Sequence, residues 1–384
     1  MKESAIVIGA GIVGLAIARA LAVRGHSVTV LERNERAVGA SIQNFGMIWP
    51  IGVANGAPYE RALLSRSIWL ELLEDAKLWH DRAGSLHVAY ADDEWAVLQQ
   101  YASANRDVRP CKLLNREAAL AASPTLVAES LRGALFNADE LIVDSREVIA
   151  RLPEYLSEKY GVQFHWRTPV TAVGTGKAWS GARRFDADKV YICNGPNFEQ
   201  LYPELFAASP FIKCKLQMLR LAAQPDGFRM GPALCGGLSL VHYAGFAEAA
   251  DVAPLRARYQ TEFGALLDLG IHVMAAQNGR GEITLGDSHA YAHTHDPFCE
   301  SAIDEAMLTY LARFARFPDM RIAQRWHGIY AKLSDGSQEF IVEAEPGVTI
   351  VNGVGGGGLG MTLSFGLAEQ LVAGKLHARE RVAA

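Results

Sequence analysis

The sequence predicts an α/β protein in which one domain, built around a parallel sheet from separated segments, carries an inserted, largely antiparallel domain. Three observations support this fold. A strand–helix–strand unit with spaced glycines occupies residues 5–32, and a second glycine-rich strand-to-helix junction lies at 348–373. The segments between them do not repeat the strand–helix rhythm of the start. The two ends of the chain are therefore expected to build one sheet together.

The N-terminal unit has the features of a dinucleotide-binding site. Residues 5–8 form an apolar run typical of a buried parallel strand. Gly9, Gly11 and Gly14 follow it with G-x-G-x-x-G spacing. The first glycine allows a tight turn, the second lets the backbone approach a pyrophosphate, and the third lets the following helix pack on the strand. The N–H groups at the start of that helix can then bind phosphate oxygens.

A second strand, residues 26–31, ends at Glu32. A carboxylate at this position can accept hydrogen bonds from ribose hydroxyls. The glycine spacing alone is weak evidence, because glycines also mark plain turns. The ordered set of strand, glycines, helix, strand and acid is specific, and it predicts a bound dinucleotide.

Composition narrows the class of protein. The 384 residues are enough for two domains, and 50% hydrophobic residues predict a sizeable core. A formal net charge of −5 with dispersed signs argues against a nucleic-acid partner. The five scattered cysteines form no C-x-x-C pair, so we expect reduced thiols in a cytoplasmic protein. We expect neither a signal peptide nor a membrane span.

Hydrophobic periodicity and turn residues predict the remaining elements. Asp144 or Ser145 is expected to cap the helix that opens at 143, and Ser41 the short helix after the first loop. The expected helices are 59–82, 93–105, 112–122, 143–152, 301–316 and 363–373. The expected strands are 84–90, 162–166, 169–173, 189–193, 214–222, 238–244, 271–276, 282–286 and 348–351.

Several motifs occur in order along the whole chain. They are the N-terminal fingerprint, Ser41 with Asn44, Val170, the pair Asn194 and Gly195, and the stretch 353–362. In this order they resemble the FAD-dependent amine and amino-acid oxidoreductases related to D-amino-acid oxidase and glycine oxidase. Three shorter stretches resemble a branch of these flavoproteins associated with phosphonate breakdown. These stretches are SIQNFGMIW at 41–49, GDSHAY at 286–291 and RWHGIY at 325–330.

The resemblance implies a Rossmann-type FAD-binding domain, glutathione-reductase-like, with an inserted antiparallel-sheet substrate domain. Residues 1–75, 145–213 and 320–384 would form the discontinuous FAD-binding domain. Residues 76–144 and 214–319 would form the substrate-binding cap.

The resemblance also implies non-covalent FAD. Glu32 would face the adenosine ribose, Ser41 the phosphates, and backbone near Val170 the adenine. N–H groups of 358–362 would face the flavin N1/O2 edge, which carries negative charge when reduced. This stretch contains neither Cys nor His for covalent attachment. The residues expected to contact FAD are Gly9, Gly11, Ile12, Val13, Gly14, Glu32, Arg33, Ser41, Asn44, Val170, Asn194, Gly195, Gly357, Gly358, Leu359, Gly360, Met361 and Thr362.

Relatives of this kind oxidise a C–N bond by hydride transfer to flavin N5, and the resulting imine hydrolyses to an aldehyde. A separate general base can be unnecessary, so we assign no catalytic residue. The electron acceptor would be oxygen or another compound, and the sequence predicts no oligomeric state. An NAD-dependent dehydrogenase, or a flavin-binding protein without turnover, remains an alternative. The glycine-rich stretch near the C-terminus argues against the NAD alternative, because a simple NAD-binding domain has no use for a second glycine-rich site.

One departure from the glycine-oxidase pattern concerns the substrate. Those relatives have Gly-x-Arg-Pro where this chain has Tyr330 and Ala331, so the arginine that clamps a carboxylate is missing. We expect an aminoalkylphosphonate, such as 2-aminoethylphosphonate or its N-methyl derivative. The alternative is a glycine or D-amino-acid oxidase or dehydrogenase with another anion clamp. The candidate substrate-binding residues are Tyr330, Lys332, Asp287 for an ammonium group, Ser288, His289 and Tyr291 for phosphonate oxygens, and Trp49 near the flavin.

Structural roles compete with these assignments. Tyr330 can be a buried aromatic, Asp287 can cap a turn, and Trp49 and Cys193 can be core residues. His289, with His293 and His295, has a spacing that suggests a metal site, but solvated histidines are the expected interpretation. We therefore predict no metal site.

Overall fold

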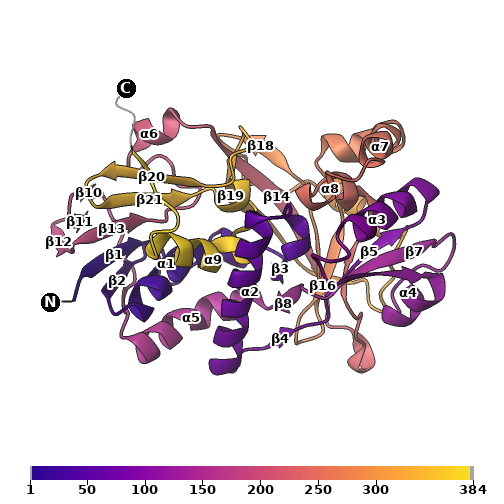
Figure 1. Cartoon of the computed structure of the whole chain (residues 1–384), viewed down its shortest axis with the longest axis horizontal. Coiled ribbons are helices and arrows are strands. Elements are labelled where there is room, and N and C mark those ends of the chain that lie inside the picture. The colour runs from indigo at the N-terminus through magenta and orange to yellow at the C-terminus, as the bar shows by residue number, and fades with distance from the viewer. Residues whose placement is uncertain (1, 381–384) are drawn as a thin grey trace.

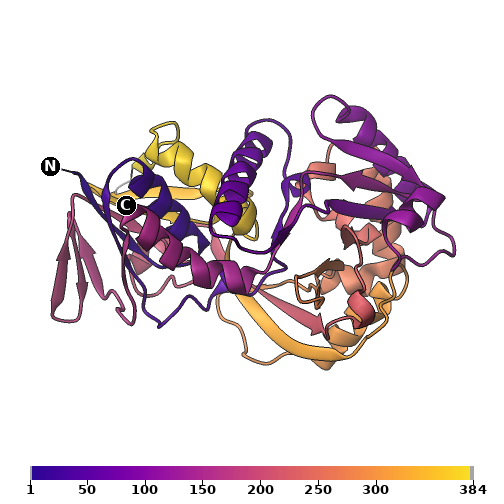
Figure 2. The ribbon, with the colours of Figure 1, turned by 90° about the horizontal axis from the view of Figure 1, so that it is seen from below.

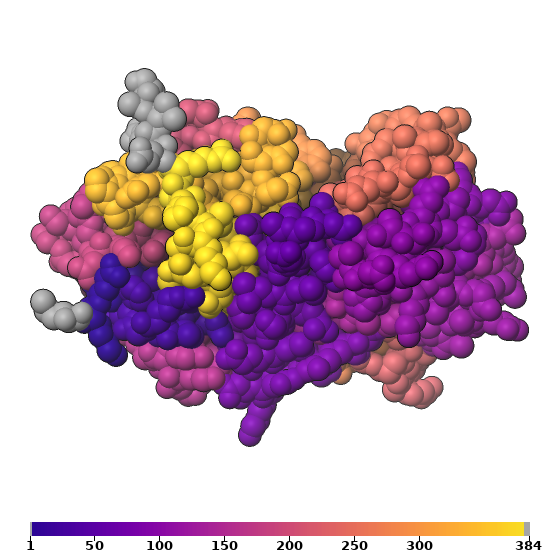
Figure 3. Space-filling view, viewed as in Figure 1, coloured from indigo at the N-terminus to yellow at the C-terminus, as the bar shows by residue number. Residues whose placement is uncertain are grey.

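The computed structural model describes residues 2–380. Two halves lie side by side along the longest axis, each built on its own large sheet (Figure 1). The first and last described strands of the chain lie in the half that holds the N-terminal fingerprint. The N-terminal third contributes to the surface of both halves (Figure 3). This agrees with the predicted α/β fold with an inserted second domain.

The first half contains a seven-stranded sheet assembled from separated segments, as the sequence predicts. Its strands, in spatial order, are β22 (Arg379–Glu380), β20 (Phe340–Glu345), β21 (Val348–Asn352), β13 (Lys189–Ile192), β1 (Ser4–Ile8), β2 (Ser27–Leu31) and β9 (Gln163–His165). The run from β21 to β9 is parallel, and β20 is antiparallel to β21. Strand β1 lies inside the sheet between β13 and β2, which explains why its residues 5–8 are apolar on both faces.

Helices cover one face of this sheet. They are α1 (Ile12–Val23), α2 (Ala57–Asp75), α5 (Ser145–Tyr160) and α9 (Gly360–Val372). Helix α9 packs between α1 and α2, so the two ends of the chain share one core. The other face packs against the small sheet of β10 (Ala172–Gly174), β11 (Lys177–Ser180) and β12 (Arg183–Asp186), together with α6 (Pro203–Ala207). Figure 2 shows this small sheet at the outer end of the half.

The second half contains a nine-stranded, mostly antiparallel sheet. Its strands are β18 (Ala290–Ala292), β14 (Phe211–Leu221), β17 (Ile283–Gly286), β16 (Met274–Gln277), β15 (Ala233–Cys235), β5 (Ser85–Ala89), β7 (Gly133–Asn137), β6 (Cys111–Asn115) and β19 (Ile322–Leu333), which pairs with β14. The helices of this half are α3 (Asp92–Ala104), α4 (Arg116–Ala122), α7 (Val252–Asp268) and α8 (Ser301–Leu311). A fourth sheet of β3 (Met47–Ile48), β8 (Leu141–Val143) and β4 (His80–Asp81) lies between the halves (Figure 1).

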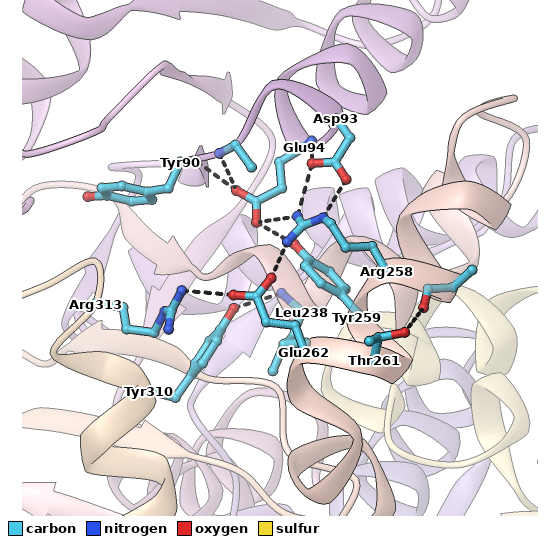
Figure 4. A network of polar contacts seen from close by, with 12 residues as sticks. Tyr90, Asp93, Glu94, Leu238, Arg258, Tyr259, Thr261, Glu262, Tyr310 and Arg313 are labelled. Carbon is cyan, nitrogen blue, oxygen red and sulfur yellow. Dashed lines mark hydrogen bonds and ion pairs between the residues drawn. The ribbon is translucent and has the colours of Figure 1, made fainter.

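A polar network joins the helices of the second half (Figure 4). Glu94 of α3 accepts hydrogen bonds from the backbone N–H groups of Tyr90 and Ala91, at 2.6 and 3.1 Å, and thereby caps its own helix. It also accepts a hydrogen bond from the Tyr259 hydroxyl of α7 at 2.7 Å. Arg258 of α7 bonds to Asp93 at 2.6 Å. These contacts fix α3 against α7.

Some predicted elements differ from those observed. The expected strand at 238–244 is instead two short 3-10 helices, η4 (Gly237–Val241) and η5 (Ala244–Phe246). Every residue of η4 is buried. Its sequence therefore lacks the alternation of polar and apolar residues that would distinguish a strand from a helix. The expected helix at 112–122 begins as strand β6, which pairs along β7 before α4 starts. Helices α2 and α8 end earlier than expected.

The predicted domain boundaries stay a prediction. Residues 320–384 were assigned to the FAD-binding domain, and within them β20, β21 and β22 lie in the seven-stranded sheet. Strand β19 from the same range pairs with β14 along its length, in the nine-stranded sheet. Within residues 2–380, none of the helices is long and apolar enough to cross a membrane.

Candidate active site

A cavity of about 720 Å³ lies where the ends of the two large sheets meet. Its walls include the turn after β1, the end of β2, the segment after β13, the glycine-rich stretch before α9, and strand β19. The motifs that the sequence singles out at both ends of the chain thus surround one space.

The N-terminal glycines have different structural roles. Gly9 has a φ of +101°, and a Cβ atom there would lie 2.5 Å from the Cys193 carbonyl oxygen. A Cβ atom on Gly14 would lie 1.9 Å from the Gly9 carbonyl oxygen, so this position holds α1 against β1. Gly9 and Gly11 line the cavity together with Ile12. Gly14 does not, which fits a packing role rather than a ligand contact.

Two helices begin at the cavity without a capping side chain at their N-cap residues. Helix α1 starts after Gly11 and helix α9 after Leu359, and neither has an acidic residue in its first turn. The N–H of Ile12 donates to Ser41 Oγ at 2.9 Å. Ser41 therefore bonds to α1 instead of capping the short 3-10 helix η1 (Ala40–Ile42), as the sequence had suggested. Free N–H groups and the positive ends of two helix dipoles favour anionic groups here.

Glu32 is held rigidly at the end of β2. Its side chain is 7% exposed and lines the cavity. One carboxylate oxygen accepts from the Ala10 N–H at 2.9 Å, and the other accepts from the backbone N–H of Asn34 at 3.0 Å. A carboxylate fixed in this way remains able to accept further hydrogen bonds from a ribose. The neighbouring Arg33 also lines the cavity.

Three other predicted cofactor residues line the cavity and stabilise its loops. Asn44 accepts from the Gly46 N–H at 2.8 Å, and Asn194 donates to the Asn197 carbonyl at 2.6 Å. The Val170 carbonyl accepts from Gln200 at 2.9 Å. The remaining members of the predicted set that line the cavity are Val13, Gly195, Gly357, Gly358, Leu359, Gly360 and Met361.

The C-terminal glycines lie directly against strand β19. Gly357 has a φ of +101°, and a Cβ atom there would lie 2.3 Å from the Ala331 carbonyl oxygen. A Cβ atom on Gly358 would lie 3.4 Å from the Tyr330 hydroxyl. Thr362 differs from the other predicted cofactor residues, because it is 1% exposed and its hydroxyl accepts from the Trp49 N–H at 2.9 Å. It therefore supports the start of α9 from within the core.

Tyr330 and Tyr291 lie on either side of Cys214 on the sheet. Cys214 pairs with Tyr330 of β19 and with Tyr291 of β18. Burial raises the pKa of the Tyr330 hydroxyl well above its ordinary value, and it raises that of Tyr291 to about 12. Both hydroxyls therefore stay protonated at neutral pH and can donate hydrogen bonds into the cavity, which Lys332 also lines.

Asp287 and His289 face the same cavity, together with two histidines that sequence reasoning missed. Burial raises the pKa of the Asp287 carboxyl to about 6. His242 follows η4 and His272 precedes β16, and burial lowers the pKa of the His272 imidazole well below its ordinary value. Neither residue belongs to a motif, so only the folding of distant segments brings them to Asp287.

Two predicted substrate residues lie outside the cavity. Ser288 is 4% exposed, and its hydroxyl accepts from the Gln217 N–H at 3.2 Å. Trp49 is buried in the core, where its ring packs near His87 and Tyr243. Both side chains fill structural positions.

The histidine spacing in the sequence suggests the wrong partners for His289. His295 bonds through Nε2 to the Lys213 carbonyl at 2.9 Å, and His293 is exposed. In the described part of the chain, the group of ligand-type side chains that converges around His289 contains His242 and His272 instead.

Comparison with known proteins identifies the family. The family model described as DAO, FAD dependent oxidoreductase, matches residues 4–373. The chain belongs to this family. Membership makes FAD the expected cofactor, as the sequence motifs predict.

Individual members of the DAO family match this chain in sequence over only part of its length. The chain is 28% identical over 241 residues to the glycine oxidase of Pseudomonas aeruginosa, a match that covers 59% of this chain and 64% of that protein. It is 37% identical over 101 residues to the Chromohalobacter salexigens bifunctional protein of tRNA 5-methylaminomethyl-2-thiouridine biosynthesis, covering 25% of this chain and 14% of that one. The chain thus matches less than two thirds of the length of these relatives.

Solved structures confirm the fold over nearly the whole chain. The glycine oxidase of Bacillus cereus superimposes with a TM-score of 0.76 at 17% identity, covering 98% of this chain and 96% of that one. The L-proline dehydrogenase of P. horikoshii superimposes with a TM-score of 0.75 at 20% identity, covering 97% and 94%.

The cavity fits FAD on the evidence of its own donor groups. The N-termini of α1 and α9, a glycine cradle at Gly11 and a fixed carboxylate at Glu32 face one space, and neither helix is capped by the side chain of its own N-cap residue. Phosphates, flavin edge and ribose are the parts of FAD that such groups bind.

Proposed function

We propose that this chain uses FAD to oxidise the C–N bond of a small amine that carries an anionic head group. The substrate that we favour is an aminoalkylphosphonate, 2-aminoethylphosphonate or its N-methyl derivative. The product would be an aldehyde, together with ammonia or methylamine.

The observation that carries this proposal is the set of charges around the cavity. Of the described residues that line it, the one arginine is Arg33, beside Glu32 at the end of β2. Tyr330 stands at the glycine-rich stretch, where a carboxylate-binding arginine is expected in glycine-oxidase-like relatives. Without that bidentate clamp, an α-amino carboxylate has no obvious anchor. A phosphonate presents three oxygens, which separate donors can bind.

Several side chains could bind such a substrate. Lys332, Tyr291 and Tyr330 can offer a positive charge and two hydroxyl donors to the phosphonate oxygens, with His289 as a further donor. Asp287 can attract the ammonium group. We infer these roles from residue type and from their common position along the cavity.

When bound, FAD accepts the hydride equivalent that leaves the carbon next to nitrogen. The protein orients that carbon and must hold the amine in its neutral form. The N–H groups at the start of α9 can stabilise negative charge at the edge of the ring. Water then hydrolyses the imine.

The test of the proposal is anaerobic bleaching of the flavin with a panel of amines. The panel should pair phosphonate, carboxylate and sulfonate head groups on the same two-carbon amine. We expect the phosphonates to reduce the flavin fastest. Faster reduction by glycine or D-amino acids would refute the phosphonate assignment and leave amine oxidation standing.

A Tyr330→Arg substitution should shift the preference towards α-amino carboxylates, because it restores a bidentate anion clamp beside Gly358. The measurement is the ratio of reduction rates for glycine and 2-aminoethylphosphonate. Tyr330→Phe is the matched control, since it removes the hydroxyl without adding charge. An unchanged substrate profile in the arginine variant would contradict the role of this position.

A glycine or D-amino-acid oxidase or dehydrogenase is the second candidate. The resemblance in sequence to the Pseudomonas aeruginosa glycine oxidase favours it. Oxygen consumption during turnover would separate an oxidase from a dehydrogenase. We also propose that FAD is non-covalent, that the protein is cytoplasmic and that nucleic acid is not a partner. A flavin that stayed with the protein after acid denaturation would refute non-covalent binding.

A further inference from the structure

Three histidines from separate segments meet beside Asp287. His242 follows η4, His272 precedes β16, and His289 follows β17. One ligand-type atom from each histidine lies within 4.8 Å of the corresponding atoms of the other two. All four residues line the cavity, so the group is open to it.

A hydrogen bond orients the imidazole of His289, and a longer polar contact faces that of His272. His289 Nδ1 lies 2.9 Å from the Gly270 carbonyl oxygen, which can only accept, so Nδ1 carries the proton. In a neutral ring the lone pair is then on Nε2. His272 Nδ1 lies 3.5 Å from Ser239 Oγ. Hydrogen bonds of this kind orient histidines that bind metals.

The Asp287 carboxylate faces the rings of both His272 and His289. Its Oδ1 lies 3.4 Å from His272 Nε2, and its Oδ2 lies 3.7 Å from His289 Nε2. The side chain is 5% exposed, and Oδ1 has no hydrogen-bond partner among the described residues. A cation between the carboxylate and the imidazole lone pair would relieve their mutual repulsion and give Oδ1 a partner.

The distances favour a metal ion as that cation. They are longer than the roughly 2.7–3.2 Å of a good hydrogen bond. Zinc binds nitrogen and oxygen at about 2.1 Å in tetrahedral geometry, which separates neighbouring ligand atoms by about 3.4 Å. The two Asp287 contacts lie close to this spacing.

We propose that His242, His272, His289 and Asp287 form a binding site for a divalent transition-metal ion, for which Zn²⁺ is the best match. Imidazole and carboxylate are ligands that zinc accepts. His242 stacks on His272 with 3.7 Å between ring centroids. It is the exposed member, so its ring has room to turn one nitrogen towards the ion. A metal ion held here would take Asp287 and His289 out of the set of side chains that contact the substrate directly, and would leave Lys332, Tyr291 and Tyr330 for the phosphonate oxygens.

The first test measures zinc bound by the FAD-loaded protein. Protein treated with a chelator is dialysed against Zn²⁺, and bound zinc is determined by mass spectrometry. We expect one zinc per chain. His272→Gln and His289→Gln should each lose it, and Asp287→Asn should weaken binding by about 10- to 100-fold. His293→Gln, a change at an exposed histidine four positions after His289, should keep the parent's zinc content.

The flavin spectrum and thermal unfolding show whether each variant is folded. A folded parent that binds well below one zinc per chain would overturn the proposal, as would parent-like zinc content in either buried-histidine variant.

X-ray absorption on the zinc-loaded parent gives a second test that needs no variant. We expect nitrogen and oxygen neighbours at about 2.0–2.2 Å with the scattering pattern of imidazole. A zinc shell without imidazole would also overturn the proposal.

Discussion

Ser41 shows how one hydroxyl can link the loop after β2 to the start of α1. Its Oγ accepts from the Ile12 N–H at the mouth of the cavity. The same loop position is where the family resemblance places a phosphate contact. The residue therefore supports the helix end that we expect to bind the pyrophosphate.

Replacing Ser41 with alanine should weaken FAD binding by about 2- to 10-fold, the effect of one lost hydrogen bond of ordinary strength. Titration of the apoprotein with FAD, followed by flavin fluorescence, measures the change. Ser67→Ala is the matched control, because that hydroxyl bonds within α2 to the Leu64 carbonyl. Equal FAD affinity in both variants would contradict the role of Ser41.

Glu140 is a second residue whose burial has a measurable consequence. It is fully buried and accepts hydrogen bonds from the Ile51 N–H at 2.9 Å and from Ser85 at 2.8 Å. Burial nevertheless raises the pKa of its carboxyl from 4.5 to about 7. The folded state thus binds a proton more tightly than the unfolded state does.

Because its folded-state pKa is raised, Glu140 should make the protein less stable as pH rises from about 4.5 to 7. Linkage over this window amounts to about 3 kcal/mol of unfolding free energy. Urea unfolding at pH 5 and pH 7.5 measures it. Glu140→Gln cannot ionise, so this part of the pH dependence should vanish. A variant that keeps the parent's full slope would rule out Glu140 as its source.

At the scale of elements, the contact between α3 and α7 depends on Glu94. This carboxylate caps α3 and accepts a hydrogen bond from the Tyr259 hydroxyl. It also forms a longer ion pair with the guanidinium of Arg258 (Figure 4). Glu262 contacts the same guanidinium at 2.5 Å from the outer side, and it is exposed. The two glutamates therefore offer a matched pair that differs in burial.

Glu94→Ala should lower the free energy of unfolding by about 3–5 kcal/mol, because it leaves a buried hydroxyl and a helix end without their partner. Glu262→Ala should cost about 0–1 kcal/mol, as exposed ion pairs do. Chemical denaturation measures both. Similar losses in the two variants would show that burial does not decide the strength of this network.

Helices and strands whose apolar residues recur with a clear period could be predicted from the sequence. Elements that form only because strands pair could not. Strand β1 and helix α1 carry a local pattern that identifies them. Strand β6 has no such local pattern. Residues 112–122 have the pattern of a helix, and the first of them form a strand only because they pair with β7. Helix η4 was missed because all its residues are buried, so no alternation of polar and apolar residues distinguishes it from a strand.

At the scale of the whole molecule, the cavity joins parts of both large sheets. Its walls come from the seven-stranded sheet through Glu32 and Asn194, and from the nine-stranded sheet through Tyr330 and Met274. A ligand that contacts both sets of residues binds the folded protein but not the unfolded chain. Its binding free energy then adds to stability.

FAD should therefore stabilise the protein by about 2.7 kcal/mol when its free concentration is 100 times its Kd. Differential scanning calorimetry of the apoprotein at increasing FAD concentrations measures the rise in Tm. NAD at the same concentrations is the control, since it shares the adenosine half. Equal shifts with both nucleotides would argue against a specific flavin site.

The sequence by itself determined the α/β class, the nucleotide fingerprint and the second glycine-rich junction, because each depends on residues that are close together in the chain. It also located Asp287, His289 and Tyr330 through short motifs. The tertiary structure alone brought His242 and His272 to Asp287, and alone placed Ser288 and Trp49 outside the cavity. Such positions depend on how strands from distant segments pair, and local periodicity carries no information about that pairing.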